Sequence, residues 1–244
     1  MLHILEALCA GPMSLAELSR ALETPKSSLA ALLRGLATAG FVVASDGSFR
    51  LGAGAFGLGS ALLQARRQLQ SSELVREGMR RLAEQAGETI LFAVPDLDGE
   101  TMTYIEILES RKPVRFAVSV GDRRPLYCTS GGRALLAAGS DDELKRYLKQ
   151  LKPEPLTGRT ETNKKKLAEA VAQAREAGVA QTFDQTAEGV LGTAAVIHEA
   201  TGRVMGALIV AAPSIRVKGK ETELAELTRS EAAVVSRNLG YRAR

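Results

Sequence analysis

The chain has 244 residues, 45% of them apolar, and a formal net charge of +4 at pH 7. This length is enough for about two domains with hydrophobic cores of their own. Only 4% of the residues are aromatic and Trp is absent, which argues against an aromatic platform for single-stranded nucleic acid.

Cysteine and histidine are scarce, with Cys9, Cys128 and two histidines in the whole chain. A disulfide framework and a metal site are therefore not expected, and a reducing compartment fits. No apolar run reaches the roughly 18 residues of a membrane-spanning helix, and no basic segment followed by an apolar stretch opens the chain. We expect a cytoplasmic protein without a cofactor, a metal or a membrane partner.

The stretch from Ser14 to Arg34 predicts two short helices joined by a tight turn. Ser14 and Glu17 have the spacing of a capping box, in which each side chain satisfies an unpaired backbone donor at a helix start. Thr24 is placed to cap a second helix whose first residue is Pro25, where a missing N–H costs nothing. Apolar residues at helical spacing mark the buried side of the pair: Leu15, Leu18, Leu22, Leu29, Leu32, Leu33 and Leu36.

The outward side of the second helix carries small residues and two cations but no acid. In helix-turn-helix proteins such a surface enters the DNA major groove, with its N-terminal residues nearest the base edges. A helix pair in some other helical domain is the alternative, and charge does not favour DNA because residues 1–60 hold four cations and four acids. The outward residues are Lys26, Ser27, Ser28, Ala30, Ala31 and Arg34.

The flanking elements favour a winged helix-turn-helix. An apolar helix precedes the pair and ends at Gly11, and a hairpin over 41–51 follows it, with a turn at 45–48. Helix, helix, turn, helix and hairpin is the order of that domain, and its wing supplies Arg50 as a further DNA contact. We expect residues 1–52 to form it.

The next segment predicts a linker. Residues 53–70 read as an amphipathic helix that contains Arg66 and Arg67 and is suited to a dimer interface. A further helix is expected over 73–85, and Gly87 ends it.

Beyond Gly87 the apolar period changes from helical to alternating, which predicts an α+β domain over residues 71–244. We expect an antiparallel sheet with helices on its faces. The predicted strands are 88–94, 101–108, 114–120, 179–183, 193–199 and 203–211. The predicted helices are 131–138, 144–151 (opened by a capping box of Ser140 and Glu143), 164–177 and 223–239.

Short runs in an ordered series then identify a family. In the first part of the chain they are Ser14–Leu18, Pro25–Ser28, Leu32–Leu36, Gly40–Val42 and Phe49–Gly52. In the rest they are Gly87–Thr89, Pro125–Leu126, Gly132–Ala137 and Glu188–Val190. With these runs the whole chain resembles the IclR family of bacterial transcriptional regulators. The resemblance implies a winged helix-turn-helix that binds operator DNA, a GAF-like domain that binds a small-molecule effector, and no enzymatic activity.

In that family the second helix of the motif reads the operator, and Lys26–Ser28 carries the match. These side chains and Arg34 can donate to phosphates or base edges. The sequence departs from the family in having Ala30 and Ala31 where members usually have a bulky polar residue followed by Arg. Loss of a bidentate Arg removes about 1–3 kcal/mol of base discrimination. We therefore expect an operator preference that differs from that of relatives.

The resemblance also implies an effector pocket. Relatives often have acids at the positions of Thr182 and Gln185, and a thiol or hydroxyls at those of Gly192, Ile209 and Ala211. All are neutral or apolar here, so the predicted pocket suits a hydrophobic or aromatic ligand better than a small hydrophilic acid. Simple packing of the sheet by the same residues is the alternative. Carried over by position, the lining is Val114, Phe116, Ser130, Gly131, Thr182, Gln185, Val190, Gly192, Ile209 and Ala211.

No catalytic residues are predicted. Cys128 stands at a predicted helix start, where the backbone dipole can lower a thiol pKa, but neither His3 nor His198 is placed to act as its base. We expect a buried, structural Cys128 and a packed or surface imidazole at His198. Asp96 and Asp98 read as turn residues.

Two classes of function follow. The first is a ligand-responsive regulator, a homodimer or a dimer of dimers, whose paired recognition helices enter successive major grooves of double-stranded DNA. Effector binding would shift the population of dimer arrangements. The second is an orphan small-molecule-binding or enzymatic GAF-like protein with a vestigial helix-turn-helix. The balanced charge of residues 1–60 and the Ala30-Ala31 pair keep the second class open.

Overall fold

The computed structural model describes residues 1–242, apart from the side chains of residues 62–72. The chain divides into two compact units, residues 1–70 and 71–244, and each is described by itself. No helix among the described residues is both long and apolar enough to cross a membrane.

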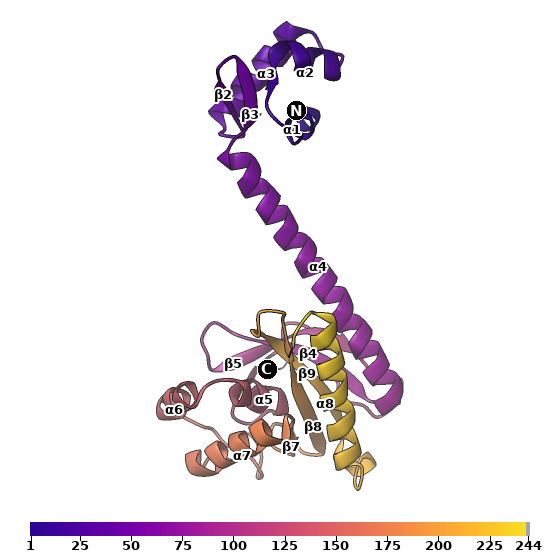
Figure 1. Ribbon diagram of the computed structural model, residues 1–244. Coiled ribbons are helices and arrows are strands. Elements are labelled where there is room, and N and C mark those ends of the chain that lie inside the picture. The colour runs from indigo at the N-terminus through magenta and orange to yellow at the C-terminus, as the bar shows by residue number, and fades with distance from the viewer. Residues whose placement is uncertain (243–244) are drawn as a thin grey trace. The chain divides into compact units, whose positions relative to one another are not determined.

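The first unit is a winged helix-turn-helix (Figure 1). A three-stranded antiparallel sheet in the order β1-β3-β2 accompanies its helices. Leu18, Leu29 and Leu33 are at most 1% exposed and form the centre of its core. The elements in order are α1 (Leu2–Leu8), β1 (Met13–Ser14), α2 (Leu15–Ala21), α3 (Lys26–Thr38), β2 (Val42–Ser45) and β3 (Ser48–Leu51).

The capping box predicted at Ser14 is confirmed, because the Glu17 N–H donates to Ser14 Oγ and the Ser14 N–H donates to the Glu17 carboxylate. The cap predicted at Thr24 is wrong. Its hydroxyl donates to the Leu22 carbonyl at 2.8 Å, and Pro25 has a non-helical ψ of 140°, so α3 begins one residue later. Leu32 was expected inside but is 37% exposed, because it lies beyond the edge of the apolar stripe of α3.

Helix α4 (Ala53–Ala86) follows the wing as one continuous helix. The prediction of two separate helices, over 53–70 and 73–85, is therefore wrong, because no break separates them. No Gly or Pro lies between 60 and 77, so nothing in the local sequence ends the first helix. The predicted stop at Gly87 is confirmed, because this residue has a φ of 64° and its N–H donates to Ala83.

The second unit is built on a six-stranded antiparallel sheet in the order β6-β5-β4-β9-β8-β7. Its strands are β4 (Thr89–Pro95), β5 (Thr101–Leu108), β6 (Arg123–Pro125), β7 (Ala180–Phe183), β8 (Val190–His198) and β9 (Val204–Pro213). The remaining helices are α5 (Ser130–Ala138), α6 (Asp141–Gln150), α7 (Lys164–Ala177) and α8 (Glu221–Asn238), and a short 3₁₀ turn, η1 (Ser214–Arg216), follows β9. The predicted α+β class with an antiparallel sheet is confirmed.

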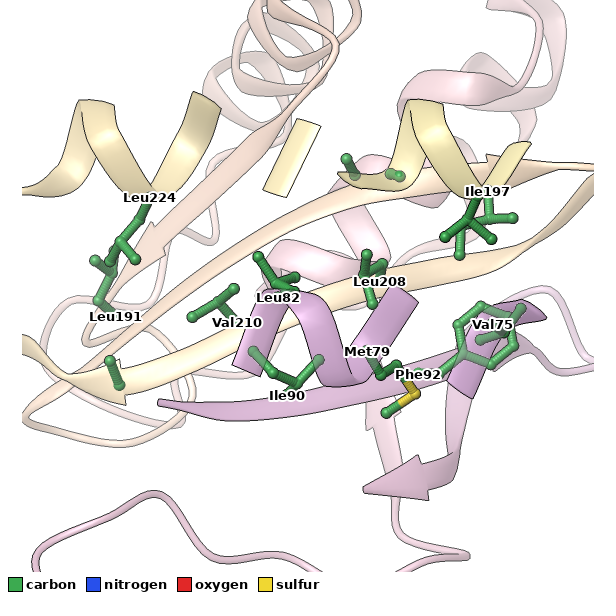
Figure 2. Packing of buried hydrophobic residues seen from close by; sticks show 14 of the residues in the cluster. Val75, Met79, Leu82, Ile90, Phe92, Leu191, Ile197, Leu208, Val210 and Leu224 are labelled. Atoms are coloured by element: carbon green, nitrogen blue, oxygen red, sulfur yellow. The ribbon is translucent and has the colours of Figure 1, made fainter. Parts of the chain in front are cut away.

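Helices cover both faces of this sheet. On one face, residues of α8 and of the C-terminal half of α4 pack on β4, β8 and β9. Figure 2 shows Met79 and Leu82 of α4 beside Ile90, Leu208 and Val210 of the sheet. On the other face, residues of α5, α6 and α7 form a second core with the same strands. These three layers bury the alternating apolar positions of the central strands on both sides.

The strand predicted over 114–120 is wrong. Its alternating valines suggested one buried face, but Val114 is 67% exposed and Val120 is 63% exposed. The partner of β5 on this edge of the sheet is β6 instead, with Thr101 opposite Pro125. The segment runs irregularly and is held by side chains.

Candidate DNA-binding and effector sites

The predicted recognition face lies on the N-terminal half of α3. Lys26, Ser27, Ser28, Ala31 and Arg34 are exposed and Ala30 is half-buried. Within the described residues no salt bridge involves Lys26 or Arg34, and α3 contains no acid. The face therefore presents two cations, two hydroxyls and small side chains that allow close approach to a groove.

The wing is a two-residue hairpin. Asp46 and Gly47 have φ values of 50° and 74°, the positive dihedrals that a tight turn between right-handed twisted strands requires. The register pairs Val43 with Arg50. Arg50 is exposed on β3, so the first unit presents a cation from its wing as well as from α3.

In the second unit, most of the predicted effector residues line one small cavity. Phe116, Ser130, Gly131, Thr182, Val190, Gly192, Ile209 and Ala211 lie around it. Its free volume is about 20 Å³, the space of about one water molecule. The structure thus brings Phe116 of the irregular segment together with predicted residues of α5, β7, β8 and β9, the last of them Ala211, 95 positions later in the sequence.

Two predicted residues do not reach this cavity. The side chain of Val114 is exposed, and its carbonyl accepts a hydrogen bond from Arg216 Nη1 at 2.8 Å. Gln185 turns away and accepts a hydrogen bond from Arg133. The sequence reasoning missed five lining residues: Leu91, Met102, Tyr104, Thr129 and Thr186. Strand alternation could have found Met102 and Tyr104, which are the buried positions of β5.

The N-terminus of α5 forms one wall of the cavity. Thr129 caps the helix, with its Oγ1 accepting from the Gly132 N–H at 3.0 Å. Close packing here depends on glycine. A Cβ at Gly131 would stand 2.6 Å from Ile209 Cδ1, and one at Gly192 would stand 2.6 Å from Ser130 Oγ. The helix start can therefore approach the sheet, with its first N–H groups lacking intrahelical partners.

Arg133 is a buried cation beside this wall. It is 5% exposed, and its guanidinium donates to the Tyr127 carbonyl and to Gln185 Oε1. Burial lowers the pKa of Arg133. The same glutamine belongs to the loop that contributes Thr186 to the cavity, so Arg133 fixes that loop to α5.

The other residues singled out in the sequence have structural roles. Cys128 is fully buried, as expected. His198 stacks on Tyr241 with ring centroids 4.6 Å apart, and burial lowers the pKa of this imidazole. Asp98 accepts from the Glu100 and Thr101 N–H groups in the β4–β5 turn, which confirms the turn reading. No group of three potential metal ligands occurs among the described residues.

Two larger depressions lie away from the predicted residues. One of about 660 Å³ adjoins α6 and the β4–β5 turn, and one of about 490 Å³ lies between β8 and α8. Neither includes a residue that was predicted to line the effector pocket. We therefore keep the small cavity as the candidate effector site.

The fold and these two sites define a class: a transcriptional regulator with a winged helix-turn-helix and a separate ligand-binding domain. Comparisons with known proteins agree. Residues 1–46 match the IclR helix-turn-helix domain, and residues 65–237 match the C-terminal domain of the bacterial transcriptional regulator IclR. The chain therefore belongs to the IclR family.

Individual relatives match over nearly the full length. The chain is 30% identical over 236 residues to the HTH-type transcriptional repressor AllR of Escherichia coli K12, covering 96% of this chain and 85% of AllR. It is 28% identical over 235 residues to the regulator KdgR of the same organism, covering 94% and 86%. The crystal structure of the Agobacterium tumefaciens repressor BlcR superimposes with a TM-score of 0.66 at 26% identity, covering 99% of this chain and 96% of BlcR. This protein is thus a bacterial transcriptional regulator that binds DNA through its helix-turn-helix and a small-molecule effector through its C-terminal domain.

Proposed function

We propose that the protein is a cytoplasmic, non-enzymatic regulator in which residues 1–52 contact the operator, 53–70 link, and 71–244 bind the effector. The observation that carries the proposal is the exposed, acid-free face of α3. Lys26 and Arg34 contact phosphates, Ser27 and Ser28 reach base edges or phosphates, and Arg50 adds a contact from the wing. Ala30 and Ala31 contribute apolar contact, for example with thymine methyl groups.

We propose a homodimer, or a dimer of dimers, as the DNA-binding species. A single copy offers no net positive charge in its DNA-binding unit, because residues 1–60 carry equal numbers of cations and acids. Two copies double the number of phosphate contacts and match a two-fold symmetric operator. The side chains of Arg66 and Arg67, which the sequence placed in the linker, lie outside the described residues.

The effector chemistry follows from the cavity walls. Leu91, Met102, Phe116 and Ile209 are apolar, and none of the described residues that line the space is acidic or basic. The hydroxyls of Ser130 and Thr182 lie together beside Gly192. Ser130 Oγ lies there, close to the start of α5, where a helix favours negative charge. These features support an aromatic or branched aliphatic ligand with one carboxylate or similar polar group directed at α5.

Fluorescence anisotropy against a labelled fragment from upstream of the protein's own gene tests the proposal. Lys26→Ala with Arg34→Ala weakens binding to all sequences and makes the negative slope of log affinity against log salt less steep, by about 2 for each bound copy. Lys149→Ala with Lys165→Ala removes two exposed cations of the second unit and leaves the slope unchanged. An unchanged slope in the first double variant, or no binding of the wild type even at low salt, contradicts operator docking by α3.

The same complex tests the effector class. Simple aromatic and branched aliphatic carboxylates are titrated in parallel with short hydroxy acids. We expect only the first group to change the operator affinity, because an effector acts through different affinities for the bound and free arrangements. A response confined to short hydroxy acids contradicts the proposed ligand class.

A further inference from the structure

Glu88 is a buried carboxylate held by two cations. It is 2% exposed, and Arg216 donates to it from Nε at 2.7 Å and from Nη2 at 2.5 Å. Lys112 Nζ lies 2.9 Å from the same carboxylate. Burial by itself would raise the pKa of Glu88, but the hydrogen bonds from Arg216 and Lys112 outweigh it and hold that pKa below its usual range. A buried carboxylate paired in this way leaves a large penalty if either partner is lost.

Glu88 lies where helix α4 is connected to the sheet. It directly follows Gly87, where α4 ends, and precedes β4. The three residues 87–89 form a short junction between that helix and the sheet. Its neighbour across space is the irregular segment 110–118, which we call the strap.

The junction holds the strap along its length. Ser110 Oγ donates to the Gly87 carbonyl at 2.9 Å, and the Ser110 N–H donates to Thr89 Oγ1 at 3.2 Å. Thr89 Oγ1 in turn donates to the Phe116 carbonyl at 2.9 Å. Together with the Lys112–Glu88 pair, these bonds tie the strap to residues 87–89 at Ser110, Lys112 and Phe116.

The strap is also a wall of the effector cavity, because Phe116 lines it. Arg216 links the strap to Glu88 a second time. Its Nη1 donates to the Val114 carbonyl, while its other nitrogens donate to the Glu88 carboxylate. Arg216 ends the turn η1, which follows β9, the strand that supplies Ile209 and Ala211 to the cavity.

We infer that Glu88, Arg216 and Lys112 form a latch that couples the state of the effector cavity to the C-terminal end of α4. The inference rests on the proposed effector site. A cavity of about 20 Å³ admits only about one water molecule, so an effector needs one wall to move. Of the irregular segments that line the cavity, the strap is the one that hydrogen-bonds to residues 87–89 in the part of the chain that the structure describes. Displacing Phe116 therefore disturbs the hydrogen bonds to residues 87–89. The ion pairs of the latch determine the free-energy cost of moving the strap.

Hydrogen exchange of the full-length protein, followed by mass spectrometry, tests the latch. Glu88→Gln keeps the shape of the side chain but removes its charge. We expect backbone exchange to speed up by about tenfold or more, the effect of losing a charge-assisted hydrogen bond, in the strap and in residues 80–86 together. Glu106→Gln is the matched control, because it breaks the Arg76–Glu106 pair between α4 and β5, 3.0 Å long, without touching the strap.

Two results overturn the inference: faster exchange in the strap with 80–86 unchanged, or no change in either segment. If Glu88→Gln does not fold, Arg216→Lys serves instead, because lysine keeps the charge but its single nitrogen cannot reach both Glu88 oxygens and the Val114 carbonyl as the planar guanidinium does. The same joint increase is expected, and an increase confined to the strap again contradicts coupling. Neither DNA nor effector enters this measurement, so its failure and the failure of operator binding are separate results.

Discussion

At the scale of single residues, burial decides the chemistry of the cysteines. Cys128 lies directly before the helix cap Thr129, where a helix start alone would favour a thiolate. The side chain is fully buried and packs with Tyr127 and Leu167. Burial raises the pKa of Cys128 to about 11, so desolvation outweighs the helix start. Cys9, in contrast, is exposed.

Thiol titration of the native protein with an aromatic disulfide reagent at pH 8 checks this difference. We expect Cys9 to react at once and Cys128 to react only after unfolding, because its thiol is neutral and shielded at that pH. A Cys9→Ser variant should show no fast-reacting thiol. Fast modification of the native Cys9→Ser protein would mean that Cys128 is accessible.

At the scale of elements, local signals placed most helices. The capping box at Ser140 and Glu143 starts α6, and the bounds predicted for α7, Lys164–Ala177, are those observed. These features depend only on residues that are close in the sequence, so they can be predicted from the sequence alone. The strand predicted at 114–120 failed because its partner edge is occupied by β6, a fact of long-range pairing.

Two helical glycines differ in why an alanine in their place would change stability: one through tertiary packing, the other through local helix propensity. A Cβ at Gly132 of α5 would stand 2.3 Å from the Leu126 backbone, whereas one at Gly35 of α3 meets nothing within 4 Å. We expect Gly132→Ala to destabilise the second unit by about 1–3 kcal/mol through overpacking. Gly35→Ala should stabilise the first unit by about 0.5–1 kcal/mol through helix propensity. Thermal unfolding of both variants measures these changes, and a stable Gly132→Ala protein would contradict the close contact.

At the scale of the whole molecule, stability is divided between two units. The first has one core, centred on Leu18 and Leu29. The second has larger cores on both faces of its sheet. Since each core lies within its own unit, a single two-state transition is not expected for the chain.

Differential scanning calorimetry should therefore show two transitions, with the first unit melting at the lower temperature because its core is smaller. Gly35→Ala identifies that transition by raising its midpoint alone, and Gly132→Ala should lower only the other. One transition that both variants shift would show that the units unfold together.

The sequence by itself determined the helices with local caps, the hairpin of the wing, the α+β class and the family. It also indicated the exposed face of α3 through the spacing of apolar residues, and most of the small cavity through the resemblance to relatives. Only the tertiary structure decided that Val114 and Gln185 leave the cavity and that Leu91, Thr129 and Thr186 enter it. It also brought Glu88, Lys112 and Arg216 together. The physical reason is that caps and turns depend on neighbouring residues, whereas cavities and buried ion pairs depend on which distant segments pack together.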